Sequence, residues 1–104
     1  MKIQRYMTKG IQETLPIQLQ FFLWELQMNL RATKKDIDYL QVYHLSTIAK
    51  DSKTFQVIHH KAEKPPYNAV YCLESEICFN DKIYIISDKY EDSLVETMLF
   101  ASEY

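Results

Sequence analysis

The sequence predicts an α+β fold, with one principal helix packed on an antiparallel sheet of about five strands. The helix is predicted by residues 15–31, a run with apolar side chains at helical spacing and no glycine. The sheet is predicted by later runs that are rich in β-branched and aromatic residues and are separated by turn signals. A chain of 104 residues is expected to form a single domain, spanning residues 1–104.

Apolar side chains occupy two sides of the predicted helix, which has Pro16 in its first turn. The broader side, which we expect to pack on the sheet, contains Leu15, Leu19, Phe22, Leu23, Leu26 and Leu30. The opposite side carries a stripe of Ile17, Phe21, Trp24 and Met28. Two thin polar lines lie between the sides, one with Gln18, Glu25 and Asn29 and the other with Gln20, Gln27 and Arg31. This pattern predicts a helix that is covered on both sides.

The stripe of Ile17, Phe21, Trp24 and Met28 could be covered in two ways. Another part of the same chain, such as the C-terminal segment, could pack on it, or a second copy or partner protein could. Aromatic and Met side chains are enriched at protein–protein contacts, and a large exposed apolar patch is uncommon on a monomer. These four residues are therefore the candidate partner interface.

The first predicted strand is a short one at residues 3–9, before the helix. Residues 39–49 and 54–62 are rich in β-branched and aromatic side chains, and we expect them to form a hairpin with its turn at residues 50–53. Two prolines place residues 63–68 in a loop or at a sheet edge, because proline cannot donate to a strand ladder.

Further strands are predicted at residues 69–73 and 82–87. The tail, residues 94–104, is ambiguous. Ser93 and Glu96 fit a capping box that would start a short helix. The tail would also pair, as a returning strand, with residues 82–87, and we favour the strand.

Several function classes leave no signature in this chain. Nucleotide-binding loops need several glycines, and the chain has only Gly10. No stretch of about eighteen apolar residues is present, which excludes a membrane-spanning helix. The first ten residues lack the apolar core of a signal peptide, so we expect a cytoplasmic protein with reduced thiols at Cys72 and Cys78. A turn between these two cysteines would also let them face one another.

Histidines supply the one candidate for metal chemistry. If the hairpin turn contains a two-residue loop, His44 lies opposite His59, whereas a loop longer by one residue places it opposite His60. Two imidazoles on one sheet face could bind Zn²⁺ or a similar metal. Two ligands do not make a site, however, and no acid or cysteine nearby has motif spacing. Solvated strand residues are the simpler interpretation.

Charge is spread unevenly, with ten Lys/Arg against six Asp/Glu up to Lys64 and two against eight from Pro65 onward. These charges could interleave on the folded surface, or form a basic face for nucleic acid and an acidic face for a basic partner. The candidate nucleic-acid contacts are Lys2, Arg5, Lys9, Arg31, Lys34 and Lys35. A platform for stacking bases could contain Tyr39, Tyr43, Tyr67, Tyr71 and Tyr84, although tyrosine is also an ordinary half-buried strand residue.

Several segments together resemble a known family. They are Arg5-Tyr6-x-Thr8-x-Gly10, Glu13-Thr14-x-Pro16 with Leu19-Gln20 and Trp24, Asp38-Tyr39-Leu40-Gln41-Val42 with Leu45-Ser46, Lys82-Ile83-Tyr84-x-Ile86, and Thr97-Met98-Leu99 with Glu103-Tyr104. The chain is similar, almost from end to end, to the small Gram-positive bacterial proteins grouped as domain of unknown function 960. The resemblance implies a single intact domain, often carried among the accessory genes of mobile elements, with no assigned catalytic residues. By association it implies a role in DNA metabolism or host interference. The segment 87–96 is longer than the family's acidic turn, which leaves the hairpin interpretation of the tail open.

These observations favour a small non-enzymatic interaction or accessory protein that self-associates as a homodimer through the helix stripe, without a cofactor. A chain of this length has a modest core, which oligomerisation would support. One alternative is a nucleic-acid-associated protein in DNA metabolism. Another is a small metal-assisted enzyme that uses His44 with His59 or His60.

Overall fold

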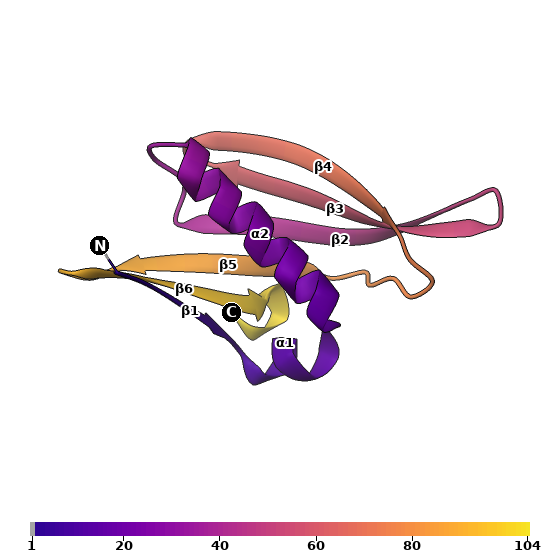
Figure 1. The fold of residues 1–104 in the computed structure, drawn as a ribbon, viewed down its shortest axis with the longest axis horizontal. Coiled ribbons are helices and arrows are strands. Elements are labelled where there is room, and N and C mark those ends of the chain that lie inside the picture. Colours follow the sequence, from indigo (N-terminus) through magenta and orange to yellow (C-terminus); the bar gives the residue numbers. More distant parts are fainter. Residues whose placement is uncertain (1) are drawn as a thin grey trace.

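A computed structural model describes residues 2–104 and contains one sheet that is crossed on one face by a long helix (Figure 1). The elements are β1 (Lys2–Met7), α1 (Lys9–Thr14), α2 (Ile17–Thr33), β2 (Leu40–Lys50), β3 (Lys53–Glu63), β4 (Pro66–Glu74), β5 (Lys82–Lys89), β6 (Ser93–Phe100) and a short 3₁₀ helix, η1 (Ala101–Glu103). The strand order is β1-β6-β5-β2-β3-β4. The predicted α+β class is confirmed, with six strands instead of about five.

The principal helix, α2, follows a short helix that the sequence analysis missed. The hydroxyl of Thr8 accepts a hydrogen bond from the backbone N–H of Ile11 and so caps the start of α1. Pro16 then stands at the N-cap of α2, where its missing N–H costs nothing. The helix therefore begins two residues later than the predicted 15–31 and ends two residues later, at Thr33.

The broad Leu side of α2 packs on the sheet as predicted. Leu19, Leu23 and Leu30 are buried, and Leu15, in the connection before α2, is buried beside them. Phe22 and Leu26 are half-buried at the flank of this surface. From the sheet, the core receives Tyr43, Leu45, Ile58, Ile83, Ile85 and Met98. Burial of this set against α2 is the main hydrophobic contribution to the fold.

The β2–β3 hairpin has the first of the two registers that the sequence left open. Lys50 pairs with Lys53, so the loop contains only Asp51 and Ser52. Their φ angles, 52° and 67°, are the left-handed values that a tight two-residue hairpin turn requires. His44 consequently lies opposite His59. The tip of this hairpin projects beyond the N-terminal end of α2 (Figure 1).

The two prolines, Pro65 and Pro66, lie at a turn and at a sheet edge. The Lys64–Pro65 peptide is cis, and Pro66 already begins β4, which is longer than the predicted strand 69–73. Because β4 is the last strand of the order, a residue without an N–H can stand in it without breaking an interior ladder.

The C-terminal tail forms a strand, β6, that pairs antiparallel with β5. The prediction of a strand is confirmed, and the alternative of a helix starting at Ser93 is wrong, because Ser93 and Glu96 are part of β6. Helical structure is confined to η1, after Phe100.

The expectation of a wholly antiparallel sheet is wrong at one edge. There β1 runs parallel to β6, with Arg5 beside Glu96. Parallel neighbours require a long connection, and almost the whole chain, including α2, lies between these two strands. The sequence contains no local signal for such a distant pairing.

Candidate functional site

The sheet has two faces with different surroundings. Side chains alternate along a strand, so Gln41, Tyr43 and Leu45 of β2 point toward α2, and Val42 and His44 point away from it. We call the side toward α2 the helix face and the other side the open face. Paired residues on neighbouring strands share a face, which assigns every strand residue to one side or the other.

The predicted stripe of α2 is divided by the structure. Ile17, Phe21 and Met28 are 57%, 63% and 42% exposed, so no part of the described chain covers them fully. Trp24 is only 9% exposed and belongs to the hydrophobic core. The guanidinium of Arg5 lies 6.0 Å from the centroid of its ring, within reach of a cation–π contact. For Trp24, therefore, the covering is supplied by its own chain.

The polar line of Gln20, Gln27 and Arg31 lies on the side of α2 that faces the sheet, which the sequence analysis did not predict. Gln20 and Gln27 are buried, 5% and 0% exposed, and Arg31 is half-buried on the same side of the helix. Gln20 donates hydrogen bonds of 2.7 Å and 3.3 Å to the backbone oxygens of Leu15 and Ile11. Buried amides cost little when they are paired in this way, so α2 can turn its polar line inward.

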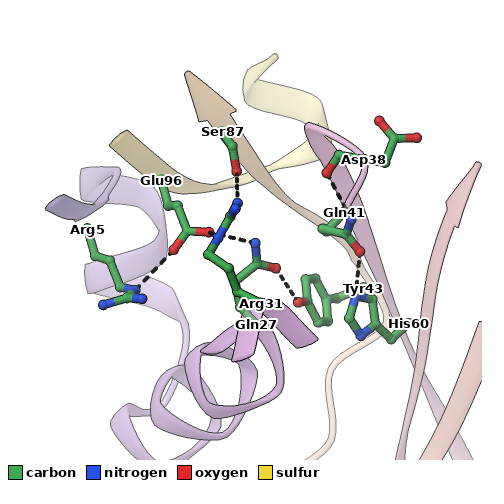
Figure 2. Close-up of polar contacts among 9 residues, drawn as sticks. All are labelled: Arg5, Gln27, Arg31, Asp38, Gln41, Tyr43, His60, Ser87 and Glu96. Atoms are coloured by element: carbon green, nitrogen blue, oxygen red, sulfur yellow. Dashed lines mark hydrogen bonds and ion pairs between the residues drawn. The ribbon is translucent and has the colours of Figure 1, made fainter. Parts of the chain in front are cut away.

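The polar line meets a buried carboxylate, Glu96, on the helix face of β6 (Figure 2). Its two oxygens accept hydrogen bonds from Arg5 Nε at 3.1 Å, Gln27 Nε2 at 2.9 Å and Arg31 Nε at 2.8 Å. Arg31 also donates from Nη2 to the Ser87 hydroxyl at 2.9 Å. Two cations and an amide thus surround one charge, which makes its burial tolerable.

A second arm of this network runs through Tyr43 and His60 (Figure 2). The Tyr43 hydroxyl donates to Gln27 Oε1 at 2.6 Å. The Tyr43 ring stacks on the His60 ring, and the two ring centroids are 4.1 Å apart. Gln41 donates its amide to the Asp38 backbone oxygen, so its Oε1 is left to accept from His60 Nε2 at 2.8 Å. We call the side chains of these two arms the helix-face network.

Burial sets the ionisation of both rings in this arm. It lowers the pKa of His60 from 6.5 to about 4 and raises the pKa of Tyr43 well above 10. The imidazole is therefore neutral and the phenol protonated near pH 7. Among the described residues, His60 Nδ1 is the one buried side-chain N or O atom that lacks a hydrogen-bond partner.

The helix-face network joins β1, β2, β3, β5, β6 and α2, and its chemistry is that of a structural anchor. Its carboxylate is enclosed by donors, its imidazole is neutral, and both are fully buried. Sequence reasoning missed it because its members are far apart in the chain. The one available signal was the amide-rich composition of the polar line on α2.

Comparison with known proteins supports the early resemblance. A family model described as "Staphylococcal protein of unknown function (DUF960)" matches residues 4–103. The chain belongs to this family. A solved structure, described as "Crystal structure of the protein of unknown function from Enterococcus faecalis", is similar with a TM-score of 0.63 and 19% identity, over 97% of this chain and 90% of that one. At this identity the likeness shows a shared fold. No curated protein matches the chain.

The histidines of this DUF960 protein lie on both faces. His44 and His59 are paired on the open face, and His60 is buried on the helix face. Within residues 2–104, no group of three or more His, Cys, Asp or Glu side chains could hold a metal ion. Cys72 and Cys78 are free thiols, the first exposed and the second half-buried.

The basic residues predicted for nucleic acid do not form one surface in the DUF960 chain. Arg5 and Arg31 form ion pairs with Glu96, so the structure places these two candidate contacts in the helix-face network. Lys9 forms an exposed pair with Glu13 at 3.8 Å, and Lys34 and Lys35 follow the end of α2. Lys9 is separated from Lys34 and Lys35 because they lie at opposite ends of α2, which spans Ile17–Thr33.

The predicted tyrosine platform is divided in the same way. Tyr43, Tyr67 and Tyr71 lie on the helix face, where Tyr43 is fully buried. Tyr84 lies on the open face, and Tyr39 is an exposed residue just before β2. The five rings therefore cannot stack on one strand of nucleic acid.

The open face of the DUF960 sheet contains a hollow of about 650 Å³ that sequence reasoning missed. It lies where β2, β3 and β5 adjoin, and its walls include Tyr39, Val42, Lys61, Lys82 and Tyr84. The hairpin register with a two-residue loop could have placed Val42 beside Lys61, but the β2–β5 pairing that adds Tyr84 and Lys82 had no local signal.

Among the helices of the described chain, none is long and apolar enough to cross a membrane.

Proposed function

We propose that this DUF960 protein is a non-enzymatic interaction protein that self-associates through the outer side of α2. The contact would be made by Ile17, Phe21 and Met28. The observation that supports this proposal is the 63% exposure of Phe21, in the second turn of α2. A large aromatic side chain in that position leaves apolar area in water, and a second protein surface would remove it.

The charge of α2 supports the same proposal. Among the exposed positions of the helix, Glu25 is the only charged residue, and its polar neighbours Gln18 and Asn29 are uncharged amides. A helix that faces only water usually carries a charged outer side. Arg31, its other charge, is directed inward to Glu96.

The spacing of the three apolar residues favours a second copy as the partner. Two α2 helices could pack antiparallel by their outer sides. Their two-fold axis would cross the contact at the level along the helix that lies between Phe22 and Leu23. Ile17 of each copy would then lie beside the partner's Met28, and the two Phe21 rings would lie near the axis. Such a contact is self-complementary, as a two-fold dimer requires. An accessory role on a mobile element and a cytoplasmic location remain expectations that come from the resemblance and the sequence.

The test is the molar mass in solution, measured by light scattering after size-exclusion chromatography. The natural protein should have the mass of a dimer, and Phe21→Glu should have that of a monomer, because a buried unpaired carboxylate in the contact costs several kcal/mol. Trp24→Ala is unsuitable, since Trp24 is part of the core.

Ile48→Glu is the matched control. Ile48 is 49% exposed near the tip of the β2–β3 hairpin, away from α2, so this variant should stay dimeric. A natural protein that stays monomeric at high concentration, or a dimeric Phe21→Glu variant, would contradict the proposal.

A further inference from the structure

Six side chains of the open face form two adjoining rows across β5, β2 and β3. Register pairing places His44 between Lys82 and His59, and Val42 between Tyr84 and Lys61. None of the six is acidic. The middle of the open face is therefore a basic surface with one aromatic ring, and we call these residues the open-face block: Lys82, His44, His59, Tyr84, Val42 and Lys61.

The two lysines of the open-face block are available to a ligand. Lys61 and Lys82 are exposed, and within residues 2–104 neither takes part in an ion pair. Both line the hollow of about 650 Å³. An unpaired lysine beside a concave surface is a good contact for phosphate, since its ammonium group can approach an anion without breaking another pair.

Two acids also border the hollow, Asp38 and Glu63. The Asp38 carboxylate accepts backbone hydrogen bonds from Leu40 at 3.2 Å, Glu63 at 3.2 Å and Lys64 at 2.9 Å. Burial raises the pKa of Asp38, but these backbone donors outweigh it and lower the pKa below its ordinary value. Its charge is thus directed to backbone N–H groups, and Glu63 is left as the free acid, at the end of β3.

Aromatic rings border the lysines. Tyr84 is half-buried, and Tyr104 meets it edge-on with ring centroids 5.7 Å apart, so one edge of the Tyr84 ring has an aromatic neighbour. Tyr39, 58% exposed, forms another part of the wall. Rings held beside cations on an open sheet are the surface on which proteins stack unpaired bases.

From this juxtaposition we propose that the open face binds single-stranded nucleic acid, with phosphates at Lys61 and Lys82 and a base stacked on Tyr84. The hollow lies on the open face beside both lysines, and suits a chain that lies across it. A free nucleotide fits less well, because tight phosphate binding uses glycine-rich loops, and Gly10, the one glycine, lies in α1. A duplex fits less well, because its bases are stacked on each other and cannot reach a tyrosine ring.

This site lies on the other face of the sheet from the stripe of α2, so it does not depend on the proposed self-association. A monomeric Phe21→Glu variant should bind with the same affinity per chain. Failure of one proposal would therefore leave the other unaffected.

The experiment measures fluorescence anisotropy of labelled oligothymidine and oligouridine with the full-length protein, across a series of salt concentrations. We expect binding at low salt that weakens as salt is raised. Lys61→Ser with Lys82→Ser should reduce the slope of log K against log salt by about 1.4, the value for two phosphate contacts on a single strand. Tyr84→Leu should weaken binding about tenfold, and Tyr84→Phe should restore it, because the ring is kept.

The matched control is Lys34→Ser with Lys35→Ser, which makes the same change of charge in the loop after α2. This variant should keep the natural salt slope. The proposal is overturned if no single strand binds at low salt, if the two lysine pairs have equal effects, or if a duplex or a free mononucleotide binds as tightly as the single strand. If Tyr84→Leu does not fold, the two lysine pairs decide the result.

Discussion

The helix face and the open face use polar residues in opposite ways. On the helix face, Glu96, Gln27 and His60 are fully buried, and each is hydrogen-bonded to another buried or half-buried side chain. On the open face, Lys61 and Lys82 are exposed and have no ion-pair partner within the described residues. The first arrangement holds elements together, and the second is free to meet a ligand.

This contrast shows why residue type alone is a poor guide to function here. Arginine and histidine would ordinarily attract attention as ligands, yet Arg5 and Arg31 are paired with the buried Glu96, and His60 is itself buried. A buried network of this kind is costly if one member is lost. An exposed lysine can be lost without effect on the fold. The two faces should therefore respond differently to mutation.

The largest effect is expected for Glu96→Ala. Removing this carboxylate leaves Arg5 and Arg31 partly buried without a counter-charge, and the free energy of unfolding should fall by about 3–5 kcal/mol. Urea denaturation followed by circular dichroism measures the loss. Glu25→Ala, an exposed acid on the outer side of α2, is the matched control and should change stability by less than about 0.5 kcal/mol. Equal effects of the two substitutions would show that the network does not anchor α2.

Acidification should produce the next largest effect, through His60. The folded protein keeps this imidazole neutral down to its pKa of about 4, whereas the unfolded chain takes up a proton near 6.5. The unfolded state therefore binds more protons in this window, and stability should fall by up to about 3 kcal/mol as the pH is lowered from 6.5 to 4.

The measurement is the free energy of unfolding at several pH values for the natural protein and for His60→Asn. The substitution should reduce the slope of stability against pH in that window, whatever it does to stability at pH 7. An unchanged slope would mean that His60 titrates alike in the folded and unfolded states, and would remove it from the buried network.

The smallest effect is expected on the open face. Lys61→Ser and Lys82→Ser should each change the free energy of unfolding by less than about 0.5 kcal/mol, because both side chains are exposed and unpaired. Thermal and urea denaturation measure this directly. A loss above about 1 kcal/mol for either would place that lysine in the fold and remove the contrast between the two faces.

Local patterns were sufficient for much of the fold. Helical spacing identified α2, and the β-branched runs with a polar turn identified the β2–β3 hairpin and two possible registers, one of which the structure has. The N-cap at Thr8 and the parallel pairing of β1 with β6 were missed. The first belongs to a helix of only six residues, and the second joins segments at opposite ends of the chain.

The candidate sites were less accessible to sequence reasoning. The stripe of α2 was identified as a unit, but the roll of the helix on the sheet buries Trp24 and leaves Ile17, Phe21 and Met28 exposed. The open-face block was not identified, since it requires that β5 pair with β2 as well as with β6. The tyrosines of the predicted platform lie on different faces of the sheet, because side chains alternate between the two faces along a strand.

The sequence by itself determined the α+β class, the long helix and the hairpin, because periodicity and turn chemistry act between neighbouring residues. It also determined the family. Only the tertiary structure decided which polar residues are interior and which are free. That decision depends on helix roll and on strand order, and both are set by packing between residues that are distant in the chain.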